Sequence, residues 1–163
     1  MKKRTTETQA ERLRQAIRHR QDQEKKELRQ TILTAAGELF LEQGYEHFSL
    51  RKVAERIGYS PTTIYLYFRD KDDLLFTVVD EGFVRFGQEL ATAASTEDPW
   101  ERLIALGRAY VNFGLQNPVY YQLMFVQRTD FLMHHQAGES KPRIAGFQIL
   151  RQTVQQAIDA GVL

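Results

Sequence analysis

The chain has 163 residues, a net charge of +1 and 42% hydrophobic residues, which is enough to bury a core and excludes disorder throughout. It has no cysteine, so disulfides, thiolate metal sites and cysteine nucleophiles are excluded, and no apolar run approaches the ~20 residues of a membrane span. The basic start of the chain lacks the apolar segment of a secretory signal. We therefore expect a soluble cytoplasmic protein.

The small net charge hides an uneven distribution. Residues 1–71 carry 15 Lys and Arg against 10 Asp and Glu, whereas residues 72–163 carry 7 against 11. Residues 1–29 hold 10 basic and 5 acidic side chains, which accounts for the whole basic excess. A basic end on an acidic body predicts a polyanionic partner at one pole of the molecule. A solvated helix of mixed charge is the alternative.

The first predicted elements are an extension and a packed helix. Residues 1–27 are rich in good helix formers but lack an apolar stripe, so we interpret them as an exposed extension that is helical in part. From Leu28 onward, apolar residues recur every three or four positions, which predicts a packed helix. This helix is predicted to stop at Gly44, because glycine is favourable just past a helix end.

Two short helices and one long helix follow. Ser49 is predicted to cap a helix over residues 50–57, and Ser60 to cap a second over residues 61–67. Asp70 is predicted to cap a fourth helix. The apolar positions of that helix are Leu74, Leu75, Val78, Val79, Phe83 and Phe86.

The rest of the chain also has helical periodicity. We predict a helix from Trp100 to Gly114, another after Asn117-Pro118, a loop over residues 127–141 and a last helix from Pro142 to Ala160. No segment alternates with period two over a useful length, so the predicted fold is all-α. The predicted regions are a basic extension (1–27), a three-helix bundle with a helix-turn-helix (28–71) and a further helical domain (72–163), which the family resemblance given below implies to be the ligand-binding and dimerisation domain.

The two short helices, joined by a tight turn, have the dimensions of a helix-turn-helix. In such a unit the first helix braces the second, whose N-terminal residues enter the major groove. Thr62 and Thr63 would offer a hydroxyl and a methyl to base edges, and Tyr65 and Tyr67 would offer phenolic hydroxyls. Lys71 can hold a phosphate. Helix-turn-helix units also occur in proteins that bind no DNA, so spacing alone leaves that alternative open.

The stretch ILTAAGELFLEQGYEHFSLRKVAERIGYSPTTIYLYFRDKDDLL, residues 32–75, closely resembles the N-terminal domain of the tetracycline-repressor (TetR) family. This resemblance implies a bacterial one-component regulator, usually a repressor and usually a homodimer on a palindromic operator in double-stranded DNA. It also implies contacts with phosphates, or with bases and the adjoining backbone. The DNA-binding candidates are Ser49, Ser60, Thr62, Thr63, Tyr65, Tyr67 and Lys71.

The second half is similar to the family more loosely. Residues 103–125 look like the ligand domain of many members, which holds a small molecule among its helices. We expect a small apolar or aromatic effector, although each candidate wall residue is more often simple core. The candidates are Phe83, Phe86, Trp100, Tyr110, Phe113, Tyr121 and Phe125. The resemblance also places the helix Pro142–Ala160 at the dimer interface. Family members usually continue through one further long helix, so the chain is either a fragment or a shortened member.

Other functions receive weaker support. His134 and His135, with Asp130 and Glu139 nearby, form a possible metal site, but adjacent histidines point to different faces of a helix and exposed loop residues are the better interpretation. No motif indicates catalysis or a cofactor. The main hypothesis is a DNA-binding regulator released from its operator by a small molecule. The alternatives are an effector-independent structural or partner-controlled DNA-binding protein, and a protein-interaction bundle with a vestigial DNA-binding domain.

Overall fold

The computed structural model describes residues 8–126 and 141–163, and every regular element in these ranges is helical, which confirms the all-α prediction. None of the helices in these ranges is long and apolar enough to cross a membrane. The elements are α1 (Gln9–His47), α2 (Leu50–Ile57), α3 (Pro61–Tyr65), α4 (Lys71–Ala93), α5 (Pro99–Gln116), α6 (Pro118–Tyr121), the π-helix η1 (Gln122–Val126) and α8 (Lys141–Asp159).

Helix α1 runs without interruption from the predicted extension into the packed part of the chain. It begins in a capping box, in which the Thr8 hydroxyl accepts from the Glu11 N–H (3.3 Å) and the Glu11 carboxylate accepts from the Thr8 N–H (2.7 Å). Residues 9–27 are all exposed, and burial begins at Ile32. Gly44, the predicted end, has φ +71°, which breaks the helical geometry, and one further turn continues to His47.

The predicted caps of the next three helices are confirmed. The side chains of Ser49, Ser60 and Asp70 each accept a hydrogen bond from the backbone N–H three residues later. Helix α3 ends at Tyr65, two residues before the predicted end. The reason is that Phe68 is buried in the core and the chain must then reach the extended backbone of Asp70, which leaves no room for another helical turn.

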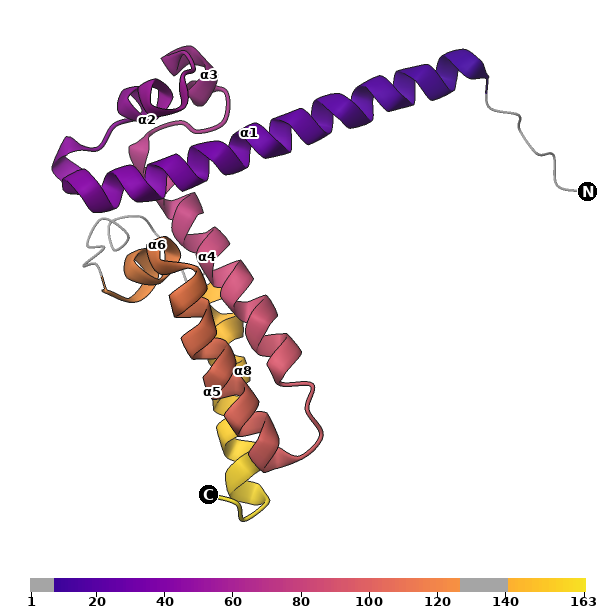
Figure 1. Ribbon diagram of the computed structural model, residues 1–163, viewed down its shortest axis with the longest axis vertical. Coiled ribbons are helices and arrows are strands. Elements are labelled where there is room, and N and C mark those ends of the chain that lie inside the picture. The colour runs from indigo at the N-terminus through magenta and orange to yellow at the C-terminus, as the bar shows by residue number, and fades with distance from the viewer. Residues whose placement is uncertain (1–7, 127–140) are drawn as a thin grey trace, which may run out of the picture.

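Helix α4 connects the two parts of the molecule (Figure 1). Helices α1, α2 and α3 lie at its N-terminal end, while α5 and α8 run alongside it toward the other end. Five of its six predicted apolar positions are buried and Phe83 is half-buried. One core therefore extends from Ile32 of α1 along α4 to Leu123 of η1, and α4 contributes to the packing of both parts.

Candidate nucleic-acid interface and effector region

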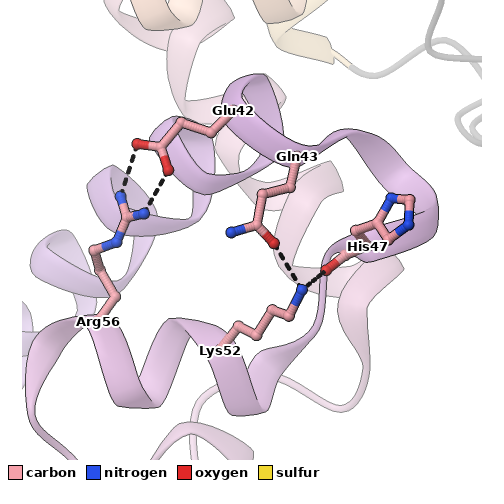
Figure 2. Close-up of polar contacts among 5 residues, drawn as sticks. All are labelled: Glu42, Gln43, His47, Lys52 and Arg56. Atoms are coloured by element: carbon pink, nitrogen blue, oxygen red, sulfur yellow. Dashed lines mark hydrogen bonds and ion pairs between the residues drawn. The ribbon is translucent and has the colours of Figure 1, made fainter.

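Helix α2 is held against α1 by buried apolar residues and by polar contacts (Figure 2). Its Leu50, Val53 and Ala54 are buried. The Arg56 guanidinium forms a two-pronged ion pair with the Glu42 carboxylate, with a first N···O distance of 2.9 Å. The Lys52 ammonium donates to the Gln43 side chain and to the His47 carbonyl, both at 2.7 Å. Helix α2 is therefore a fixed brace for α3.

The ion pair changes the titration of both partners. The hydrogen bond from Arg56 lowers the pKa of Glu42, and the same bond raises the pKa of Arg56. Both groups are therefore charged at neutral pH, and the ionic part of the brace persists there.

Helix α3 presents two of its predicted contacts to solvent. Thr62 and Tyr65 are exposed, Tyr65 to 59% of its surface, whereas Ile64 between them is fully buried. Thr63 is half-buried, and its hydroxyl lies 2.9 Å from the Ser60 hydroxyl, which also caps the helix. The geometry therefore divides the predicted set: Thr62 and Tyr65 face outward, while Ser60 and Thr63 already have hydrogen-bond partners within the turn.

The predicted phosphate contact Lys71 lies at the junction of α1 and α4. Its ammonium donates to the Tyr45 carbonyl (3.2 Å) and sits 3.7 Å from the centroid of the Tyr45 ring. The Tyr45 hydroxyl donates to the Asp72 carboxylate (2.7 Å). This hydrogen bond, with burial second, raises the pKa of Tyr45 to about 12. Lys71 therefore joins the end of α1 to the start of α4 in this structure. The other two candidates, Ser49 and Tyr67, are half-buried, and Ser49 also caps α2.

Three exposed residues around the helix-turn-helix were absent from the predicted set. Arg51 lies in the first turn of α2, Leu66 directly after α3 is 80% exposed, and Arg69 forms a loose ion pair with Asp73 at 3.8 Å. The sequence could have indicated the two arginines, because Arg51 closely follows the predicted cap Ser49 and Arg69 directly precedes the predicted cap Asp70. Both arginines are exposed, Arg51 in the helix before α3 and Arg69 in the segment after it, and a polyanion attracts such exposed cations.

Six of the seven predicted effector residues pack together in what we call the aromatic cluster. Within it, Phe86 is the hub, with ring centroids 5.1 Å from Phe113, 5.4 Å from Tyr110 and 5.6 Å from Phe125. Trp100 lies apart in the first turn of α5, about 15 Å along the helix from Tyr110, and is 45% exposed. The cluster consists of Phe83, Phe86, Tyr110, Phe113, Tyr121 and Phe125.

The aromatic cluster contains one polar pair. The hydroxyls of Tyr110 and Tyr121 lie 3.5 Å apart, and their rings pack edge to face at 6.1 Å. This hydrogen bond, with burial second, raises the pKa of Tyr110. A paired hydroxyl among apolar rings provides one orienting group in an otherwise apolar environment, which is the usual composition of a small-molecule site.

Helix α6 and η1 connect the cluster to α1 and α4. Val119 packs on α1 at Gly37, where an added Cβ would lie 2.7 Å from its Cγ1 atom. The Gln30 side chain of α1 donates to the Tyr120 hydroxyl at 3.2 Å. On α4, Met124 packs so closely on Gly82 that an added Cβ would lie 2.6 Å from its sulfur. A segment that carries Tyr121 and Phe125 thus also contacts α1 and α4.

A separate groove of about 540 Å³ lies between α1 and α2. Its lining includes Glu27, Glu38 and Arg56 and no aromatic residue, so its chemistry differs from that of the aromatic cluster. The four residues of the possible metal site, from Asp130 to Glu139, lie outside the described residues. Within the described ranges, no three His, Asp or Glu side chains are grouped as a metal ion requires.

A braced helix-turn-helix with an exposed recognition helix, joined by one long helix to a second helical bundle, defines a DNA-binding regulator. The model for bacterial regulatory proteins of the tetR family matches residues 32–78. This match assigns residues 32–78 to the DNA-binding domain of the TetR family of transcription regulators, whose members are DNA-binding proteins and not enzymes, and the solved structures below support the same family for the chain.

Solved structures share the fold of most of this chain. A TetR family transcription regulator from Marinobacter aquaeolei VT8 is 21% identical, with a TM-score of 0.68 over 86% of this chain and 73% of that one. A TetR/AcrR family regulator from Thermobifida fusca YX-ER1 is 27% identical, with a TM-score of 0.60 over 84% and 73%. A fatty acid degradation regulator from Bacillus halodurans is 20% identical, with a TM-score of 0.58 over 82% and 69%.

Proposed function

We propose that this regulator is a repressor that binds a palindromic operator as a homodimer and leaves it when a small apolar or aromatic effector binds at the aromatic cluster. The observation that carries the proposal is that one short segment, α6 with η1, contributes rings to the cluster and also contacts α1 and α4. A ligand that separates the rings therefore moves a segment that touches the DNA-binding end.

The DNA contacts follow from exposure on α3. Thr62 and Tyr65 would meet base edges or the adjoining backbone, because both side chains of the short recognition helix are exposed, Thr62 near its start and Tyr65 at its end. The other four candidates would act indirectly, by holding the turn and the backbone in position. They are Ser49, Ser60, Thr63 and Tyr67. Lys71 would reach a phosphate only by leaving Tyr45, so we assign it first to the α1–α4 junction.

The dimer would form through α8. Gly146, Thr153 and Ala157 face the rest of the protein and are buried, while Phe147 and Ile158 on another face are 65% and 49% exposed. Phe147, Val154 and Ile158 lie at helical spacing on one side of α8, where exposed Arg151 stands between Phe147 and Val154. Such a face suits an isologous contact in which the same surface meets itself.

The effector proposal is tested by release of DNA. A duplex selected by the protein from a random-sequence pool is labelled, and its anisotropy is followed as apolar and aromatic compounds, straight-chain fatty acids included, are added. Phe125→Leu removes a ring that is 41% exposed at the margin of the cluster and is expected to weaken release. Trp100→Leu removes an exposed ring outside the cluster and should leave release unchanged.

An effector-independent regulator is the second candidate, and one observation favours it. Phe113 is fully buried and Phe86 only 3% exposed, so the centre of the cluster is filled by protein side chains. If the protein binds its selected duplex but no compound in the panel releases it, this second candidate replaces the first. If the protein selects no duplex, both candidates are wrong.

A further inference from the structure

The N-terminal half of α1 projects from the molecule as a rigid helix (Figure 1). Residues 9–27 are exposed throughout and span about 28 Å. An isolated helix of this length is marginal in water, but this one extends a packed helix, so it needs no separate nucleation. The capping box at Thr8 and the Arg20–Glu24 ion pair at 3.0 Å stabilise it further. The projecting half therefore holds its side chains in fixed directions.

The charges of this half divide between its faces. At 100° per residue, Arg14, Arg18 and Lys25 lie within about 40° of one another, and Arg29 continues the same line one turn later. We call Arg14, Arg18 and Lys25 the basic stripe. Nothing in the described residues pairs with these three side chains.

Other charges lie beside the stripe or on other faces. Glu11 on the stripe's side is held by Thr8, and Asp22 lies at its margin. Arg12, Arg20 and Lys26 point to other faces of the helix, and Arg20 is paired with Glu24. The stripe is therefore a line of three cations that form no ion pair within the described residues and outnumber the two acidic side chains beside it.

The position of Arg29 shows which side of α1 carries the basic stripe. Its guanidinium lies 5.8 Å from the centroid of the Phe68 ring. Phe68 is buried between the end of α3 and the start of α4, three residues after Tyr65. Because Arg29 continues the line of the stripe, the stripe runs along the side of α1 that faces the end of the recognition helix. Arg69 beside Phe68 is exposed at the same place, in a loose ion pair with Asp73 at 3.8 Å.

We propose that the basic stripe of α1 holds the phosphate backbone of DNA beside the site read by α3. The inference rests on the proposed contact between α3 and DNA and extends it outward. A projection of about 28 Å corresponds to about eight base pairs, since each strand rises 3.4 Å per phosphate. Phosphate contacts carry no sequence information, so the stripe adds affinity and register and leaves base preference to α3.

A membrane surface is less suited to this helix than DNA. Helices that lie on lipid bury a continuous apolar face. Between Gln9 and Glu27 the only large aliphatic side chains are Leu13 and Ile17, and they are 62% and 49% exposed. Two such residues make too small an apolar face, whereas the line of cations matches a polyanionic backbone.

The test compares two triple variants of the full chain that remove the same charge from the same helix. The stripe variant is Arg14→Gln, Arg18→Gln and Lys25→Gln, and the control is Arg12→Gln, Arg20→Gln and Lys26→Gln. Glutamine keeps helix propensity, and far-ultraviolet circular dichroism verifies the helix content of both. Binding to the selected duplex is measured from low to moderate salt, with flanks of about ten base pairs and without flanks.

The stripe variant is expected to lose about tenfold or more in affinity at low salt for the flanked duplex, and about 2.7 in log–log salt slope per protomer. The control variant should stay close to wild type, and on the unflanked duplex all three proteins should bind alike. Equal losses of DNA affinity in both variants, or no loss in either, would overturn the inference. The proposed contact of α3 with bases would remain intact. Wild-type affinity of the stripe variant for DNA, with loss of binding to phosphatidylglycerol vesicles, would overturn it in favour of a membrane. If the wild type selects no duplex, the proposed function itself fails.

Discussion

Polar side chains fasten the helices at the DNA-binding end of this molecule, whereas ring packing dominates the aromatic cluster, although Asp98 caps α5 there in the same way as Ser49 caps α2. Between Ser49 and Asp73 each helix begins at a side chain that accepts a backbone N–H, and α2 is fastened to α1 by Lys52 and Arg56. Around Phe86 the contacts are between rings. The hydrogen bonds at the DNA-binding end are local and directional, whereas the packing of the rings depends on how well their volumes fill the space.

This difference has a functional consequence. Directional caps hold a recognition helix in one orientation, which reading of a base sequence requires. Packed rings can rearrange around a guest molecule at the cost of contacts that the guest replaces. In the proposed function, the protein therefore combines a firmly held recognition helix with a ring-packed region that would accept the effector, and α6 contacts both.

The largest expected effect comes from emptying the centre of the cluster. Phe113→Ala should lower the free energy of unfolding by about 3–5 kcal/mol, because Phe113 is fully buried among other rings and its removal leaves a cavity. Val111→Ala, on the same helix but 58% exposed, should change stability by no more than about 0.5 kcal/mol. Urea denaturation measures both. Similar losses in the two variants would show that volume does not govern this region.

Two glycine-to-alanine substitutions distinguish the close contact between α6 and α1 from the general effect of alanine on helix stability. Gly37→Ala should destabilise by about 1–3 kcal/mol, since its Cβ would lie 2.7 Å from the Val119 Cγ1 atom. Gly87→Ala in α4 should stabilise by about 0.5–1 kcal/mol, because within the described residues its added Cβ meets no atom inside 4 Å. Thermal unfolding should therefore shift in opposite directions. If Gly37→Ala stabilises the protein, α6 shifts easily to make room for the added Cβ.

A cap substitution tests the polar half of the comparison. In the wild type the N–H of Asp73 donates to the Asp70 carboxylate at 2.8 Å. Asp70→Ala removes this acceptor at the start of α4 and should lower the free energy of unfolding by about 1 kcal/mol. Asp70→Asn keeps an acceptor oxygen and should recover most of the loss. Urea midpoints of the two variants against wild type provide the measurement. Equal losses would point to the charge of Asp70 and not to its hydrogen bond.

Sequence predicts most where the partners are close along the chain. The caps at Ser49, Ser60 and Asp70 were predictable because donor and acceptor lie three residues apart. The position of Lys71 was not, because it lies on Tyr45, 26 residues away. Helical spacing assigned apolar residues to buried faces, but it does not say how far along a bundle each one lies, so Trp100 could not be separated from the aromatic cluster.

The α1–α4 junction, where polar and ring contacts meet at Tyr45, is expected to respond to alkaline pH. The hydrogen bond to Asp72 raises the pKa of Tyr45 to about 12, above the value of about 10 for an unfolded tyrosine. The folded state therefore retains the phenolic proton more strongly. Its stabilisation is complete below about pH 10 and is lost as the pH rises toward about 12.

Two variants isolate this small effect from the titration of other groups. Tyr45→Phe has no phenolic proton, so its deficit in stability relative to wild type should shrink between pH 9 and pH 11.5, as wild type loses the same interaction. Asp72→Asn removes the charged acceptor that raises the pKa of Tyr45 and should likewise flatten the dependence. Urea midpoints across this range measure both. A deficit that stays constant with pH would show that the Tyr45–Asp72 bond does not tie α1 to α4. The junction would then be held by the contacts of Lys71 with the ring and carbonyl of Tyr45 and by the apolar core.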